Sequence, residues 1–325
     1  MQKIKSVRDA DVSGKRVLLR VDFNVPLDTS SGQAVITDDT RIKAALPTIE
    51  LLAEKGAKIS ILTHLGRPEG KVVENLRTAP LSRRLSELLP GVEVTMLENV
   101  RFDPGEEAND EAFAKKLAEG EDMFVNDAFA ASHRAHASIV GVAKLLPSYA
   151  GLLMEKEIEK LSEALAPIKP SLAIVGGAKL ETKAPLIEKL AKIYEKVLIG
   201  GNIANQYKST RANVFLPEDG LPQLEGMFDI GPKTKAAWVG EVKEARFVLW
   251  NGPVGWFEKG YGEATYALAQ ALVDSGVGAV IGGGDTAAAV VKFPFDPEKV
   301  FISTGGGATL EFLAHGTLPG IEVLR

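Results

Sequence analysis

Runs of β-branched and apolar residues that end in glycine constrain this chain more than any other feature. In the second half each run leads directly into a glycine turn, as Ser171–Val175 leads into Gly176–Gly177. Alternation of these runs with helical patterns predicts parallel strands, whose carboxyl ends meet along one ligand-binding edge of a doubly wound sheet. The other predicted pairs are Lys196–Ile199 with Gly200–Gly201, Arg246–Trp250 with Asn251–Gly252, Gly278–Ile281 with Gly282–Gly284, and Val300–Ser303 with Gly305–Gly307.

Two of these turns, GGGDT and TGGGAT, each precede a predicted helix. A helix N-terminus aimed at the sheet edge favours an anion such as phosphate, because its N–H groups are unpaired and its dipole is positive there. An ordinary tight turn is the simpler explanation for any one of them, but five such turns on one edge favour a ligand site. The chain contains neither GxxxxGK[ST] nor a GxGxxG loop after a strand, which disfavours a nicotinamide-dependent dehydrogenase.

Three charged residues follow these turns. Lys179 and Lys183 lie four apart after Gly177, which predicts two ammonium groups on one helix face. Such groups repel each other unless an anion lies between them, although a lysine can also extend to solvent. Asp285 follows the GGG turn and is either a helix cap or a Mg²⁺ ligand.

The first half carries a set of polar and basic residues near predicted strand ends. We expect strands at Arg16–Val25, Ala57–Thr63 and Met123–Asn126 and a helix at Arg41–Lys55. Several arginines leaving strand ends together predict a small, highly anionic ligand, since the guanidinium fork suits carboxylate and phosphate, whereas a single arginine would more simply form a surface ion pair. The set comprises Asp22, Asn24, Arg41, His64, Arg67, Arg101 and His133–Arg134–Ala135–His136. The HxxH spacing suggests zinc only weakly, because no third ligand is evident.

Length and composition indicate the number of domains and the class of protein. A chain of 325 residues is long enough for about two domains, and Met154, Ile158, Leu161 and Leu165 recur at helical spacing between the halves. We therefore expect an α/β protein with two doubly wound, mainly parallel-sheet, Rossmann-like domains joined by a helix and hinge. The absence of cysteine and of a long apolar run predicts a cytoplasmic protein without a membrane partner, and the net charge of −5 disfavours nucleic acid as a partner. We expect a monomer.

Ten ordered motifs resemble those of the phosphoglycerate kinases. They are RVDFNVP, RIKAALP, THLGRP, LENVRF, VNDAFAASHRAHAS, GGAKLETK, FDIGPKT, WNGPVGWFE, IGGGDT and STGGGATLE, and they extend over the whole chain. The resemblance implies reversible phosphoryl transfer between 1,3-bisphosphoglycerate with ADP and 3-phosphoglycerate with ATP, dependent on Mg²⁺. It implies an acceptor domain over residues 1–153, completed by the tail 308–325, and a nucleotide domain over 154–307 that begins with an interdomain helix at 154–166.

The resemblance also implies roles for individual residues. Those expected to bind 3-phosphoglycerate are Asp22, Asn24, Arg41, His64, Arg67, Arg101 and Arg134. Those expected to bind ATP or ADP are Gly177, Lys179, Lys183, Gly200, Gly201, Asn251, Pro253, Glu258 (on the ribose), Gly284, Asp285 (on the metal) and Thr286. The groups expected to stabilise the transferring phosphoryl group are Arg41, Lys179, Lys183, Gly283 and Gly306. Because the acceptor carboxylate is already ionised, no general base is expected, but closure of a hinge is.

The chain departs from the family pattern in three places. Asn202 stands where a third glycine is usual, so the turn would need an asparagine with positive φ. Ala204–Leu224 is shorter than its family equivalent, and Met227 and Phe228 replace a small residue near the expected adenine pocket. The stretch Leu89–Glu98 is expected to lack a family helix and strand. Two alternatives therefore stay open, namely a catalytically silent binding protein and a kinase for a related small acid.

Overall fold

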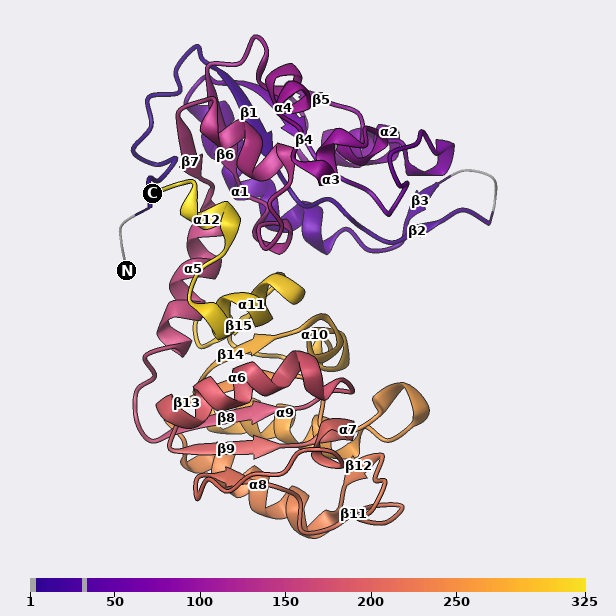
Figure 1. The fold of residues 1–325 in the computed structure, drawn as a ribbon, viewed down its shortest axis with the longest axis vertical. Helices are drawn as coiled ribbons and strands as arrows, with labels where there is room; N and C mark the ends of the chain where they lie inside the picture. Colours follow the sequence, from indigo (N-terminus) through magenta and orange to yellow (C-terminus); the bar gives the residue numbers. More distant parts are fainter. Residues whose placement is uncertain (1–3, 31–33) are drawn as a thin grey trace. The chain divides into compact units, whose positions relative to one another are not determined.

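The computed structural model describes residues 4–30 and 34–325. The chain divides into two compact units (Figure 1), of which unit 1 comprises Met1–Ile158 with Thr317–Arg325 and unit 2 comprises Glu159–Gly316. The first division falls within the helix α5, Leu152–Ala164, where the sequence predicts the linking helix. The limits of the functional domains stay a prediction. In the described part of the chain, no helix combines the length and the apolar character that a membrane span requires.

Unit 1 is built on a five-stranded sheet in which every neighbouring pair is parallel. Its strand order is β5-β4-β1-β6-β7, with β1 at Arg16–Arg20, β4 at Lys58–Leu62, β5 at Val94–Met96, β6 at Met123–Asn126 and β7 at Ser148–Ala150. Successive residues of a strand point to opposite faces. Leu19 therefore packs in the cluster that contains α1 and α2, whereas Leu18 packs with Phe113 of α4.

Helices cover both faces of this sheet. The longer ones are α1 at Thr40–Glu54, α2 at Ala79–Leu88 and α4 at Glu111–Ala118, and the short ones are α3 at Gly105–Ala108 and α12 at Pro319–Glu322. A short antiparallel ribbon pairs β2, Leu27–Asp28, with β3, Val35–Ile36. Single turns of helix connect these elements at Glu74–Leu76, Val100–Phe102, Phe129–Ala131, Ala137–Gly141 and Val142–Lys144. The tail is tied to unit 1, since the Gly320 N–H donates to the Ser132 carbonyl at 2.9 Å.

Unit 2 repeats the same plan with six parallel strands in the order β10-β9-β8-β13-β14-β15. They are β8 at Ser171–Val175, β9 at Lys196–Ile199, β10 at Val214–Phe215, β13 at Phe247–Asn251, β14 at Gly278–Gly282 and β15 at Val300–Ile302. An antiparallel pair, β11 at Gly220–Leu221 and β12 at Asp229–Ile230, lies outside this sheet.

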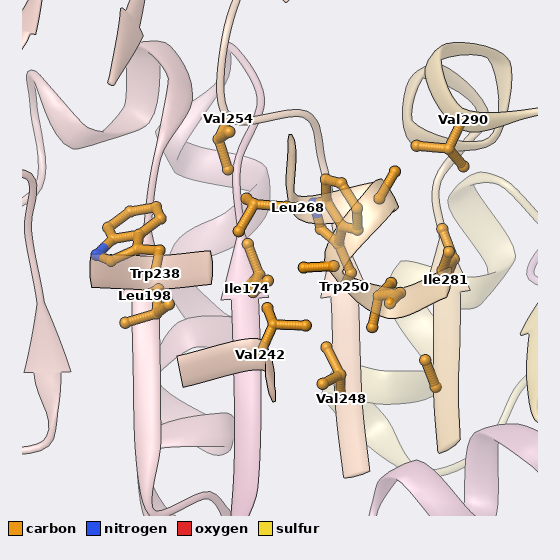
Figure 2. Packing of buried hydrophobic residues seen from close by; sticks show 14 of the residues in the cluster. Ile174, Leu198, Trp238, Val242, Val248, Trp250, Val254, Leu268, Ile281 and Val290 are labelled. Atoms are coloured by element: carbon orange, nitrogen blue, oxygen red, sulfur yellow. The ribbon is translucent and has the colours of Figure 1, made fainter. Parts of the chain in front are cut away.

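The helices of unit 2 again lie on both faces of the sheet (Figure 1). On one face Trp238 of α8 and Leu268 of α9 pack against Ile174, Trp250 and Ile281 of the strands (Figure 2). On the other face α6 packs on β8 and β9 beside α11. The helices are α6 at Leu180–Ile193, α7 at Gly201–Ala204, α8 at Pro232–Glu244, α9 at Glu263–Ser275, α10 at Gly284–Val290 and α11 at Gly307–His315, with one further turn at Phe257–Lys259. The predicted α/β class with mainly parallel sheets is confirmed.

Two details differ from the sequence-based expectations. The first strand ends at Arg20, not at Val25, because the Phe23 N–H leaves the strand ladder and donates to the Thr63 hydroxyl at 3.0 Å. The stretch Leu89–Glu98 contains a short strand, β5, which the sequence did not predict; the absence of a family helix and strand from this stretch stays a prediction. This strand is three residues long and lies at the sheet edge, where it pairs only with β4.

Candidate active site

The polar residues of unit 1 meet because β1 and β4 are adjacent and parallel, so that their carboxyl ends coincide. Asp22 and Asn24 follow β1, and His64 and Arg67 follow β4. The Asp22 carboxylate accepts a hydrogen bond from Arg41, which lies in the first turn of α1. The Gly66 N–H donates to Asn24 Oδ1 at 2.9 Å. These contacts fix residues from three chain segments at one edge of the sheet.

A buried polar network lies beneath this edge. The guanidinium of Arg20, only 1% exposed, donates from Nε to Ser138 Oγ at 2.9 Å. The Ser138 hydroxyl in turn donates to Glu106 at 2.7 Å, and His136 Nδ1 lies 3.5 Å from the same carboxylate. Burial alone would raise the pKa of Glu106, but the hydrogen bond from His136, the Arg20 charge and the Ser138 contacts hold it below its usual value. Glu106 is therefore ionised and balances the buried arginine.

His64 is held neutral at this edge. Burial and the positive charges of Arg20, Arg101, Arg41 and His136 lower its pKa well below the usual 6.5. Arg20 Nη2 lies 3.2 Å from His64 Nδ1. A guanidinium can only donate, so Nδ1 must accept and the ring proton must reside on Nε2. His64 is therefore a neutral hydrogen-bond donor through Nε2.

Arg101 brings further positive charge to the same place. Its Nη1 donates to the Gly66 carbonyl at 2.8 Å, and its Nε lies 3.1 Å from a Glu107 oxygen but outside hydrogen-bonding geometry. Burial lowers the pKa of Arg101; the Glu107 carboxylate partly opposes this, and the nearby charges of Arg134 and Arg67 lower it further. The side chains of Arg67 and Arg134 are exposed. We call Asp22, Asn24, Arg41, His64, Arg67, Arg101 and Arg134 the basic cluster.

Unit 2 contains a pocket of about 320 Å³ at the carboxyl ends of its strands. Its lining comprises Gly177, Ala178, Gly201, Asn202, Met227, Phe228, Pro253, Gly255, Trp256, Glu258 and Asp285. Of the predicted nucleotide residues, this lining includes Gly177, Gly201, Pro253, Glu258 and Asp285. It does not include Lys179, Lys183, Gly200, Asn251, Gly284 or Thr286, nor the predicted catalytic Gly283 and Gly306.

Lys183 and Asn251 are directly linked beside this pocket. The ammonium group of Lys183 donates to Asn251 Oδ1. Burial lowers the pKa of Lys183 to about 8, although the nearby Asp285 carboxylate acts to raise it. Asn251 Nδ2 is buried and has no hydrogen-bond partner among the described residues. A charged group with a reduced pKa and an unpaired donor at one sheet edge are typical of a site that binds an anionic ligand.

The glycine turns let the backbone segments of this edge come together. Gly201 has φ of +65°, and a Cβ there would lie 2.8 Å from the Gly177 nitrogen. Asn202 follows inside the helix α7 and is not one of the residues with a positive φ, so the expected conflict at this asparagine does not arise. Thr286 is buried, and its hydroxyl accepts from the Gly252 N–H at 2.7 Å. It supports the turn rather than lining the pocket.

Lys179 differs from its expected placement. It occupies the N-cap of α6 with extended φ and ψ angles, so it lies before the helix and does not share a helix face with Lys183. Its side chain is exposed. The four-residue spacing was the wrong basis for pairing the two lysines, because α6 begins only at Leu180.

Sequence reasoning missed two groups of residues. The first comprises Arg20 and Glu106, which lie beneath the basic cluster. The charge inside the apolar run LLRV could have indicated Arg20. The second is the pair Phe228 and Trp256 on the pocket wall. Phe228 was noted as a departure from the family pattern, and Trp256 had no distinguishing signal within its motif.

Asp285 fits a Mg²⁺ ion held mainly by nucleotide phosphates. It is an exposed carboxylate in the first turn of α10, and it lines the pocket. Mg²⁺ in nucleotide enzymes is usually bound through one or two carboxylates together with phosphate oxygens and water. Within residues 4–30 and 34–325, no group of three or more His, Asp or Glu side chains is arranged to hold a metal ion. This includes the HxxH segment, in which His136 instead faces Glu106.

Comparison with known proteins agrees with this arrangement. A family model described as "Phosphoglycerate kinase" matches residues 7–96, 89–214 and 206–316. The solved structure of phosphoglycerate kinase from Coxiella burnetii is 36% identical, with a TM-score of 0.87 over 99% of each chain. That of phosphoglycerate kinase from Pyrococcus horikoshii OT3 is 30% identical, with a TM-score of 0.83 over 99% of this chain and 98% of the other.

Proposed function

Because this chain belongs to the phosphoglycerate kinase family and is a phosphotransferase, we propose that it transfers a phosphoryl group reversibly between 1,3-bisphosphoglycerate and ADP. The products of that direction are 3-phosphoglycerate and ATP, and we propose that Mg²⁺ is required. We further propose that the chain works as a cytoplasmic monomer. The basic cluster of unit 1 is the proposed acceptor site, and the pocket of unit 2 is the proposed nucleotide site.

The observation that carries this proposal is the excess of positive charge in the basic cluster. Arg134 and Arg67 lie close enough to lower the pKa of Arg101, and Arg20, Arg101 and Arg41 all act on His64 in the same way. Like charges gathered at a partly buried edge repel one another unless an anion joins them. A ligand that carries both a phosphate and a carboxylate meets this need.

The proposed reaction requires little acid–base catalysis from the protein. The acceptor is a carboxylate, which is ionised near neutral pH, so no proton has to be removed before attack. Catalysis then depends on alignment of the two oxygens and on neutralisation of charge around the transferring group. We assign this to Arg41 in unit 1 and to Lys179, Lys183 and the amides of Gly283 and Gly306 in unit 2. His64, as a neutral Nε2–H donor, would orient the acceptor.

Asp285 would hold the Mg²⁺ ion, which supplies charge neutralisation to the nucleotide phosphates. Lys183 becomes fully charged when phosphate binds, because a nearby anion raises the pKa of an ammonium group. The unpaired Asn251 Nδ2 beside the Gly282–Gly283 turn offers a further donor. Glu258, exposed on the pocket wall, is our candidate for the ribose hydroxyls.

The first test is a coupled assay of ATP-dependent turnover with 3-phosphoglycerate and Mg²⁺. We expect turnover in the native chain, its loss in Lys179→Ala, and no loss in Lys192→Ala, which removes an exposed lysine from the helix α6 that Lys179 precedes. No turnover from folded native protein would contradict the proposal and favour a silent binding protein. Faster turnover with another phosphorylated hydroxy acid would instead identify a kinase for a related substrate.

A further inference from the structure

Two asparagine side chains join the chain segments that surround the unit 2 pocket. Asn202 Nδ2 donates to the Ala178 carbonyl at 3.1 Å and so links α7, which follows β9, to the turn after β8. Asn205 Nδ2 donates to Asn202 Oδ1 at 3.2 Å and to the Met227 carbonyl at 3.1 Å, and its Oδ1 accepts from the Met227 N–H at 3.2 Å. Ala178, Asn202 and Met227 all line the pocket, so these two amides connect three parts of its wall.

These contacts leave one orientation for each amide. The Met227 N–H can only donate and its carbonyl can only accept, so Asn205 must present Oδ1 to the first and Nδ2 to the second. Asn205 Nδ2 then donates to Asn202 Oδ1, which leaves Asn202 Nδ2 to face the Ala178 carbonyl. A reversed Asn202 amide would set two donors against each other at one end and two acceptors at the other. The bond to Ala178 therefore requires the amide nitrogen of Asn202.

The bond from Asn202 continues a set of backbone contacts along the turn after β8. The Gly177 carbonyl accepts from the Ile203 N–H at 3.1 Å, so α7 already holds this residue through the main chain. The Asn202 side chain extends the contact by one residue, to the Ala178 carbonyl. The turn is thereby fixed as far as the peptide group that precedes Lys179.

Lys179 is held by its two flanking peptide groups. It is the N-cap residue of α6, with φ of −109° and ψ of 106°, and its side chain is exposed. The Ala178 carbonyl on one side accepts from Asn202, and the carbonyl of Lys179 itself accepts from the Thr182 hydroxyl at 2.9 Å. Peptide groups are planar, so fixing both carbonyls fixes the two backbone angles at Lys179. Those angles determine the direction in which its side chain leaves the turn.

We propose that Asn202 is a positioning residue, whose hydrogen bond to the Ala178 carbonyl aims Lys179 at the transferring phosphoryl group. The inference rests on the proposed function, in which Lys179 stabilises that group. A fixed positive charge lowers a barrier only when it points at the place where negative charge develops, so a small loss of alignment slows the reaction. Asn202 is also a residue at which the sequence departs from the family pattern, and neither glycine nor alanine could supply this donor.

Steady-state kinetics of Asn202→Ala provide the first test. In the coupled assay with ATP, 3-phosphoglycerate and Mg²⁺, we expect kcat to fall about 3- to 10-fold, the effect of losing one hydrogen bond between neutral groups. The KM for 3-phosphoglycerate should stay unchanged, because its proposed site is in unit 1. Asn213→Ala is the matched control, since Asn213 Nδ2 donates to the Ala191 and Tyr194 carbonyls outside the pocket at 2.9 and 3.0 Å. It should lower stability and leave kcat unchanged.

A double-mutant cycle on binding separates positioning from direct contact with the ligand. Calorimetry with inorganic tripolyphosphate in Mg²⁺ buffer is run on the native chain, Asn202→Ala, Lys179→Ala and the double variant, after circular dichroism has confirmed that each is folded. We expect Asn202→Ala to weaken tripolyphosphate about 3- to 10-fold in the native chain but less than about 2-fold once the Lys179 side chain is absent. Such non-additivity is the signature of a residue that acts through Lys179.

The other results have defined meanings. Unchanged kcat in Asn202→Ala would overturn the inference, while turnover of the native chain upholds the proposed function. An equal loss of tripolyphosphate affinity with and without the Lys179 side chain would also overturn it, because Asn202 would then touch the ligand or support the pocket in general. A loss of kcat in Asn213→Ala as large as that in Asn202→Ala would assign the effect to stability and overturn it too. A folded native chain without turnover would remove the proposed function, and with it the role of Lys179.

Discussion

Replacing Lys183 with methionine should make unit 2 more stable near neutral pH while it abolishes the site. Lys183 is partly buried, and its pKa falls to about 8 because burial penalises the charged form. At pH 7 the native protein therefore holds a charge that the unfolded chain carries more easily. Methionine keeps the length and apolar stem of the side chain without that charge.

The size of the effect follows from the two pKa values. A shift from 10.5 to about 8 corresponds to a cost of about 3 kcal/mol at pH 7. Methionine also loses the hydrogen bond to Asn251, which contributes about 1 kcal/mol. We therefore expect Lys183→Met to raise the free energy of unfolding of unit 2 by about 2 kcal/mol at pH 7.

The sign of the pH dependence provides a second check. The folded pKa lies below the unfolded one, so between pH 8 and 10.5 the unfolded chain binds more protons and native stability rises with pH. The cost of charged Lys183 shrinks to about 1 kcal/mol by pH 10, which should remove the advantage of the variant.

Tryptophan emission during urea unfolding is the assay, because Trp238, Trp250 and Trp256 all lie in unit 2 and report on it alone. Lys192→Met, at an exposed position of the same helix, should change the free energy of unfolding by less than about 0.5 kcal/mol. A Lys183→Met protein that is no more stable than the native chain at pH 7, or whose advantage persists at pH 10, would refute the reasoning.

Three other changes test unit 1. Arg41→Ala should lower kcat about 10²- to 10³-fold and leave the KM for ATP nearly unchanged. Steady-state kinetics measure both constants, with Arg83→Ala, at an exposed arginine, as the control. Glu106→Gln leaves buried Arg20 without its anion and should cost about 3–5 kcal/mol of stability, measured by circular dichroism in urea. Burial raises the pKa of Asp127 to about 6, so native stability falls as pH rises from about 4 to 6. Asp127→Asn can still accept hydrogen bonds from the Leu153 and Met154 N–H groups. Its stability, measured by urea unfolding across this pH range, should fall less than that of the native chain.

Central strands were predictable from the sequence, whereas of the four edge strands of the two large sheets only β15 was predicted. β6, β8 and β9 have the predicted bounds, since a strand buried on both faces is a continuous apolar run. β5 and β7 are three residues long and were missed, because so short a run carries no periodic signal. The carboxyl-end glycines located the ligand edge because the register of a parallel sheet brings strand ends together.

The buried residues beneath the site were harder to predict from the sequence than the residues that form the site itself. Asp22, Asn24, His64 and Arg67 follow strand ends and could be grouped by position alone. Arg20 is inside a strand and Glu106 is in the four-residue helix α3, far apart in sequence, and only the folded chain joins them through Ser138. The N-cap position of Lys179 likewise depends on where α6 begins, which helix spacing does not determine to within a residue.

The two units share an energetic feature that bears on function. In unit 1 burial lowers the pKa values of Arg20 and Arg101, and in unit 2 it lowers that of Lys183. Each of these cations is less favourably placed than it would be in water, and each lies at or beneath the carboxyl edge of a parallel sheet. A chain selected for stability alone would replace them with apolar residues of similar volume. Their retention is best explained by an anion that joins them during the catalytic cycle, so ligand binding should stabilise each unit separately, with 3-phosphoglycerate acting on unit 1 and ADP on unit 2.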